Sequence, residues 1–159
     1  MNATNARSGA LAGLVGGVVM AMWSMVVLAA TGAGFWTPVN LIAHTIWRGA
    51  PTDGSFSIGA LLLGLLVHMV MSVAFGVVLA TLATRLAGTL PALLAAGMTF
   101  GLVLWLVNQY VIWPAIDETA AQAFTPWVFA AGHLLFGLVA AVLLGRQPAH
   151  RGLGRQLPA

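Results

Sequence analysis

The chain has 159 residues, of which 60% are hydrophobic and 6% are charged, and it contains no cysteine. A soluble domain carries about 25% charged residues, so this composition excludes a water-facing surface and indicates a membrane protein. The net charge of +3 comes from six Arg and three acidic residues, with no basic face of the kind that nucleic acids bind. The absence of Cys excludes disulfides and thiol chemistry.

Four apolar segments are long enough to span a bilayer, which takes about 20 helical residues. We expect an all-α, four-helix transmembrane domain over residues 1–145, with helices at about 8–30, 56–84, 91–113 and 126–145. For the first segment, an uncleaved helix is favoured over a signal peptide because its apolar run has spanning length. Pro114 is expected to end the third helix.

The connection between the first two helices contains a short amphipathic stretch at residues 38–48. Trp36 and Trp47 bracket this stretch, and Trp prefers the headgroup level of a bilayer. We therefore expect a short helix that lies in the membrane interface, with His44 as one of its interfacial anchors.

The placement of the arginines predicts the orientation of the chain. With four spans both termini lie on one side, and that side collects Arg7, Arg85, Arg146, Arg151 and Arg155. The positive-inside rule puts this side in the cytoplasm, where residues 146–159 are expected to form a disordered tail. Four tryptophans are then expected to anchor the outer interface: Trp36, Trp47, Trp113 and Trp127.

Small residues recur at every fourth position of the second helix, a spacing that lets membrane helices approach closely. The run that begins at His68 aligns without a gap with the run that begins at His133. The alignment matches Ser72, Gly76 and Ala80 with Gly137, Ala141 and Gly145, and it matches Gly13 and Gly17 with Gly97 and Gly101. We expect two helical hairpins in parallel orientation, although apolar helices rich in small residues also look alike by chance.

His68 and His133 are the ionisable residues that lie within the predicted spans, away from helix ends. Such residues are costly in a membrane and indicate a functional site by default. Asn108, Gln109 and Ser72 are expected to line one polar site with them, open to the outside. Two interpretations stay open: proton handling by the imidazoles, or neutral His side chains that each donate an interhelical hydrogen bond.

The same two imidazoles suggest cofactors. Two His from different helices are a ligand set for haem b, and the Met-rich runs at 20–25 and 68–71 are soft ligands for Cu(I). However, neighbouring Met in each run point to different helix faces, and Met is a common packing residue. We expect no cofactor, and a haem- or copper-binding redox component is the alternative.

No catalytic constellation is apparent. Asp117 and Glu118 are adjacent and are expected to be exposed to water, so they do not form an acid/base pair. The sequence contains no phosphate loop, Ser-His-acid set or zinc-helix motif. We expect a non-enzymatic membrane protein whose His site senses or relays protons, or an accessory subunit; the third alternative is a packing subunit. The small-residue stripes are also compatible with a homo-oligomer or a membrane-complex partner.

Three short motifs are spread over most of the chain: Gly-Ala-Leu-Ala-Gly at 9–13, His-x3-Ser-x2-Phe at 68–75, and His-Leu-x-Phe at 133–136. With these motifs the chain resembles small four-helix bacterial inner-membrane proteins of the YagU type. The loop between the first two helices lacks the longer insertion of that type. The resemblance implies a location in the bacterial inner membrane and a link to acid tolerance.

Overall fold

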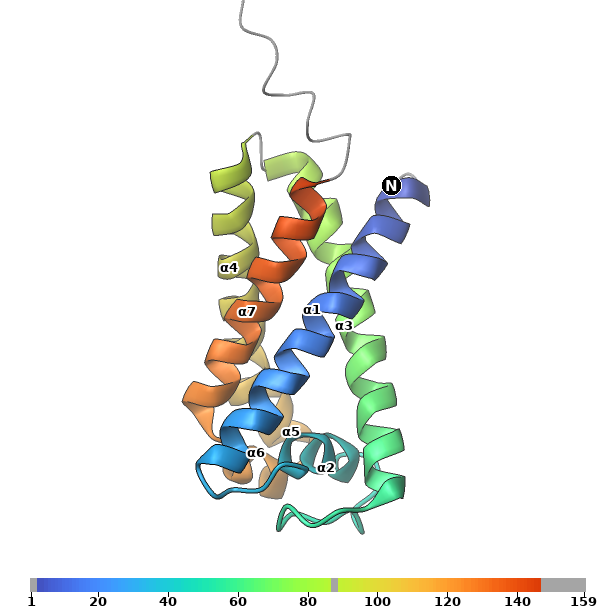
Figure 1. Ribbon diagram of the computed structural model, residues 1–159, viewed down its shortest axis with the longest axis vertical. Coiled ribbons are helices and arrows are strands. Elements are labelled where there is room, and N and C mark those ends of the chain that lie inside the picture. The colour runs from blue at the N-terminus through green and yellow to red at the C-terminus, as the bar shows by residue number, and fades with distance from the viewer. Residues whose placement is uncertain (1–2, 87–88, 147–159) are drawn as a thin grey trace, which may run out of the picture.

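The computed structural model describes residues 3–86 and 89–146, and this part of the chain is helical with no strand (Figure 1). The long helices are α1 (Ala3–Ala30), α3 (Ile58–Leu86), α4 (Leu90–Val107) and α7 (Pro126–Gly145). The short ones are α2 (Thr37–His44), α5 (Trp113–Ile116) and α6 (Glu118–Ala123), together with a π-helical turn, η1, at Asn108–Ile112. The predicted tail lies outside the described residues from position 147 onward.

The prediction of an all-α protein with four helices of membrane-spanning length is confirmed for the described residues. Four helical stretches are long and apolar enough to cross a membrane, at Asn5–Ala30, Ile58–Arg85, Leu90–Ile116 and Pro126–Gly145. The first helix begins about one turn earlier than expected, and the second is shifted by two residues toward the C-terminus. Large apolar side chains on the outer faces of α1 and α3 are exposed, which is typical of a surface that contacts lipid.

The prediction that Pro114 ends the third helix is wrong. The chain stays helical from Leu90 to Ile116 because the turn before the proline widens into η1, where the Trp113 N–H bonds to the Asn108 carbonyl oxygen. A proline lacks an N–H and crowds the carbonyl four residues before it, here that of Tyr110. A π turn relieves this conflict without ending the helix.

The long helices pack in the order α3, α1, α7, α4, and α3 and α4 make few contacts with each other (Figure 1). Glycines set the close contacts. A Cβ atom on Gly13 would lie 2.2 Å from the Ser72 carbonyl oxygen of α3, and one on Gly97 would lie 2.4 Å from the Gly137 carbonyl oxygen of α7. The small-residue stripes are therefore used within the chain, between α1 and α3 and between α4 and α7.

Two apolar clusters occupy opposite ends of the bundle. The end that carries the N-terminus is filled by small and medium side chains of all four long helices: Ala12, Leu79, Ala80, Ala83, Leu93, Ala140, Ala141 and Leu144. At the other end, α2 and α6 lie across the bundle, and Leu28, Leu41, Ala120, Phe124, Val128 and Phe129 form the second cluster (Figure 1). Trp36 and Trp47 flank α2 at this end, and Trp113 and Trp127 lie in α5 and the first turn of α7.

Candidate functional site

A cavity of about 230 Å³ lies between the two apolar clusters, lined by residues of α1, α2, α3, α7 and the α4–η1–α5 stretch. Its lining is mostly apolar, with a few polar groups. All five polar residues singled out from the sequence contribute to it: His68, Ser72, Asn108, Gln109 and His133. The fold thus brings together side chains that are as much as 65 positions apart in the sequence (133 − 68).

His133 is held on both ring nitrogens. Its Nδ1–H donates to the Phe129 carbonyl oxygen of the same helix at 2.7 Å, and its Nε2 accepts from the Asn108 side-chain amide at 3.2 Å. Because a carbonyl oxygen only accepts, the Nδ1 atom carries the proton and the ring is neutral in this arrangement. The imidazole therefore connects α7 to the start of the π turn in the third span.

His68 connects α3 to α1. Its Nε2–H donates to the Gly17 carbonyl oxygen at 2.9 Å. A Cβ on Gly17 would lie 2.4 Å from the Ser72 hydroxyl oxygen, so the glycine is what lets this part of α3 approach α1. The Nδ1 atom of His68 has no hydrogen-bond partner within the described residues. In the neutral ring it offers a lone pair beside the cavity.

The π turn explains why two consecutive polar residues reach the same interior. Successive residues of an α-helix point about 100° apart, so Asn108 and Gln109 would diverge there. In the wider turn Asn108 reaches His133, while Gln109 is buried and its amide is placed 3.5 Å from the Ala121 carbonyl oxygen of α6. Pro114 thus has a role at the site, because it requires the turn that orients both amides.

Two residues that line the cavity carry a buried polar atom without a partner. The Ser24 hydroxyl and the Trp105 indole N–H are buried and make no hydrogen bond within the described part of the chain, although both residues line the cavity. A buried donor left unpaired costs roughly 1–3 kcal/mol. Sequence reasoning missed both residues because neither is ionisable, and small and aromatic residues are common on membrane helices.

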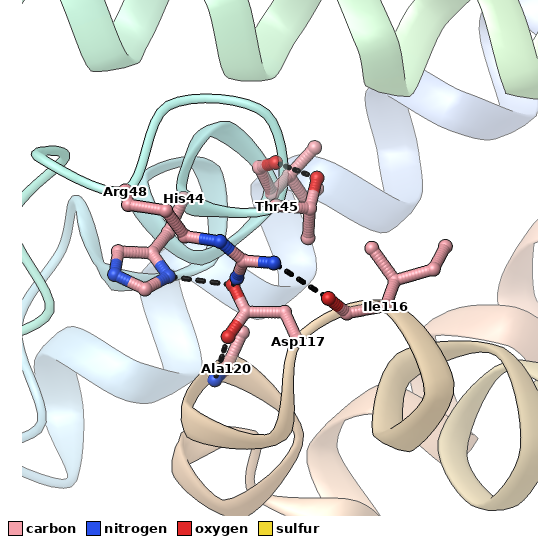
Figure 2. Close-up of polar contacts among 7 residues, drawn as sticks. His44, Thr45, Arg48, Ile116, Asp117 and Ala120 are labelled. Carbon is pink, nitrogen blue, oxygen red and sulfur yellow. Dashed lines mark hydrogen bonds and ion pairs between the residues drawn. The ribbon is translucent and has the colours of Figure 1, made fainter.

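A second polar cluster lies at the end of the bundle that carries α2 and α6, shown in Figure 2. The Asp117 carboxylate accepts a hydrogen bond from His44 Nδ1 at 2.5 Å and forms an ion pair with Arg48. Arg48 also donates to the Ile116 carbonyl oxygen at 2.5 Å, and the Ala120 N–H donates to the other carboxylate oxygen at 3.1 Å. We call His44, Arg48 and Asp117 the polar clamp, because they join the C-terminal end of α2 to the start of α6.

The clamp corrects two expectations from the sequence. Asp117 was expected to be exposed to water with Glu118, but its side chain is only 2% exposed, whereas Glu118 is exposed as expected. His44 was expected to anchor the interface, but it is buried against Asp117. The available signal was the position of Asp117 as an N-cap, directly before the helix-forming run of α6, where a carboxylate accepts a backbone N–H.

The surroundings of Asp117 keep it charged. Burial alone would raise the pKa of its carboxyl group, but hydrogen bonds from His44 and the Ala120 N–H, with the charges of His44 and Arg48, lower the pKa below its ordinary value. The carboxylate is therefore the fixed negative group of the clamp at neutral pH.

The cavity fits the two alternative cofactors, haem b and Cu(I), unequally. At about 230 Å³ it is smaller than the roughly 300–1,000 Å³ of ordinary ligand pockets, so it does not accommodate a haem between His68 and His133. For Cu(I) the donor set is suitable, because Met20 and Met71 line the same cavity as both imidazoles. His133 is held through Nδ1–H to a carbonyl as metal-bound His residues are, but its Nε2 accepts from the Asn108 amide, so a metal ion would have to displace that contact.

Comparison of the chain with protein-family models, with curated proteins and with solved structures found no match.

Proposed function

We propose that this chain is a non-enzymatic protein of the bacterial inner membrane that senses protons at the His68–His133 site. The observation that carries the proposal is the double hydrogen bonding of His133, between the Phe129 carbonyl oxygen and the Asn108 amide. His is the side chain whose ordinary titration falls between pH 5 and 8. Because His133 is buried and hydrogen-bonded as a neutral ring, a site built on it is suited to respond to acidification well below neutral pH.

Proton uptake at His133 changes a helix–helix contact. The Nε2 atom accepts from the Asn108 amide nitrogen, and a protonated Nε2 becomes a donor. Asn108 must then turn its amide to present oxygen, or the contact breaks. Because Asn108 begins the π turn, the event is transmitted to the junction of α4 and η1 and to its contact with α7.

The geometry favours sensing over proton relay. His68 and His133 are the only ionisable side chains in the cavity lining within the described residues. Toward the N-terminal end of the bundle the interior is the first apolar cluster, built of Ala and Leu side chains. A relay across the membrane needs a chain of polar groups through that half, and this cluster supplies none.

Orientation and symmetry are part of the proposal. Arg7 and Arg85 lie at the end of the bundle opposite α2, which supports cytoplasmic termini by the positive-inside rule, with the cavity in the outer half. Gly13 meets Ser72 just as Gly97 meets Gly137, and these are the pairs that the internal alignment matches. This equivalence supports two related hairpins, and the position of α2 across the outer end supports an interfacial helix.

The test is hydrogen–deuterium exchange of the protein in nanodiscs at several pH values, compared with His133→Asn and His68→Gln. Asn can still donate to the Phe129 carbonyl oxygen and Gln to that of Gly17, while neither titrates. On acidification we expect faster exchange over residues 107–113 in the wild type than in His133→Asn, with residues 140–144 of the apolar cluster unchanged. Equal exchange of the wild type and both variants at every pH would contradict proton sensing.

Cu(I) binding is the second candidate, favoured by Met20 and Met71 on the same cavity as both imidazoles. The purified protein would be loaded with Cu(I) under reducing conditions, and its metal content and absorption spectrum measured before and after oxidation. One copper per chain, lost in Met71→Leu but kept in Met22→Leu, supports this function, because Met22 is absent from the cavity lining. Metal loss in both variants or in neither contradicts it.

A further inference from the structure

The cavity opens toward the lipid between α3 and the third span. Met71 on α3 and Ile112 and Ile116 on the facing span line the cavity, yet these residues are 45%, 41% and 51% exposed. Residues that both line a cavity and are exposed mark its mouth. Since α3 and α4 contact each other little, this mouth lies on the surface that the bundle presents to the bilayer. A ligand that enters here must be soluble in lipid.

The interior offers hydrogen bonds that the protein leaves unused. The Ser24 hydroxyl, on a residue that is 2% exposed, and the Trp105 indole N–H are buried donors with no acceptor in the described part of the chain. Both residues line the cavity, one from α1 and the other from α4. Both donor atoms have almost no accessible surface, so the Ser24 and Trp105 side chains must turn toward the cavity before a ligand with two acceptor oxygens can give them the partners that they lack.

Size and shape restrict the ligand further. An apolar cavity of about 150 Å³ holds benzene, so about 230 Å³ has room for one ring or two fused rings. Aromatic side chains surround the space, and they favour a flat ring by stacking or edge contacts: Phe75, Trp105, Phe129 and Phe136. We propose that the cavity binds the head group of a lipid-soluble quinone, with the ring carbonyls accepting from Ser24 and Trp105 and the apolar tail leaving between α3 and α4.

This binding does not depend on the proton response proposed above, and it is tested with two ligands of the same ring skeleton. Binding of 1,4-naphthoquinone and of naphthalene to the detergent-purified protein would be measured by isothermal titration calorimetry at one pH. The variants Ser24→Ala and Trp105→Phe each remove a buried donor that has no partner, so the fold loses no hydrogen bond. Ala21→Leu fills the cavity, and Ala29→Leu adds the same atoms to an exposed position of the same helix.

We expect naphthoquinone to bind at least about tenfold more tightly than naphthalene, since two hydrogen bonds distinguish them. Ser24→Ala and Trp105→Phe should each weaken the binding of naphthoquinone about three- to tenfold and leave the binding of naphthalene unchanged. Ala21→Leu should abolish binding, and Ala29→Leu should not. The proposal is overturned if neither ligand binds, if both bind equally, if neither donor variant is selective, or if Ala21→Leu binds as the wild type does.

Discussion

At the scale of single residues, Asp117 shows how a buried charge is stabilised at the end of the helix bundle. Asp117 is buried, but His44, Arg48 and the Ala120 N–H all contact its carboxylate, so its charge is compensated by two side chains and a backbone donor. The carboxylate also caps α6 and thereby fixes the segment that follows the third span. One residue thus stabilises both a helix terminus and the junction of two short helices.

Replacing Asp117 by Asn should destabilise the protein by about 1–3 kcal/mol, because Arg48 and His44 lose a charged acceptor in a buried setting. Asn still caps the Ala120 N–H, so α6 should remain helical. Thermal unfolding in detergent gives the measurement, and Glu118→Gln is the matched control. Glu118 is the exposed neighbour, so its substitution should change stability by less than about 0.5 kcal/mol. Equal effects of the two variants would contradict the role of the clamp.

The clamp also predicts a dependence of stability on acid. The pKa of Asp117 is lowered in the folded protein, so its contribution is fully present above the unfolded value of about 3.9 and is lost as the pH falls through the folded pKa. The difference in melting temperature between the wild type and Asp117→Asn should therefore be smaller at pH 3 than at pH 5. If the difference in melting temperature is larger at pH 3 than at pH 5, the pKa of Asp117 is not lowered in the folded protein.

The polar residues of the cavity were predictable because ionisable groups stand out in an apolar sequence. His68 and His133 identified the region, and Asn108, Gln109 and Ser72 followed from their depth in the predicted spans. The unpaired donors and the clamp were not predictable, for they depend on which helices meet. Asp117 caps the N–H of a residue three positions away, but its partner His44 is 73 positions away.

At the scale of elements, the lengths of the apolar runs predicted the approximate lengths of the helices. They did not predict that the third span continues past Pro114. Proline commonly ends a helix, and only the tertiary structure shows that a π turn allows α4 to continue into α5. The consequence is functional, since the same turn brings Asn108 and Gln109 into the cavity. The π turn before Pro114 therefore accounts both for the continued helix and for the position of the two amides in the candidate site.

The glycine contacts predict equivalent behaviour of the two helix pairs. Gly97→Ala and Gly13→Ala should each destabilise the protein by about 1–3 kcal/mol, because the new Cβ meets a backbone carbonyl oxygen that cannot turn away. Denaturation of the purified variants would be compared with Ala95→Leu, which adds atoms at an exposed position of α4. If the glycine variants are as stable as this control, the close helix approach does not hold the bundle together.

The whole molecule is an arrangement of two tight helix pairs joined through α1 and α7, with the cavity on the side where α3 and α4 stay apart. Small-residue spacing predicted close helix approach, and the glycine contacts show that it occurs between α1 and α3 and between α4 and α7. It did not predict that the pairs join through α1 and α7, because many apolar faces of similar composition are available for that contact. The cavity and its mouth are consequences of this arrangement and are invisible in the sequence.

The absence of Cys makes the orientation directly testable. Thr52→Cys and Thr84→Cys place single thiols at exposed positions near opposite ends of the bundle. With cytoplasmic termini, a membrane-impermeant maleimide should label Thr52→Cys in spheroplasts with an intact inner membrane and should label Thr84→Cys only after the membrane is opened. The reverse pattern would place the cavity on the cytoplasmic side and contradict sensing of external acid.

Proton sensing requires that His133 is a neutral imidazole whose proton uptake is coupled to Asn108. The direct measurement is nitrogen-15 NMR of the histidine rings and the Asn108 side chain across a pH titration of the purified protein. We predict an Nδ1–H tautomer of His133 at high pH, then protonation of Nε2 with a simultaneous shift of the Asn108 amide. An Nε2–H tautomer at high pH, or an Asn108 amide that does not respond when His133 titrates, would contradict the account.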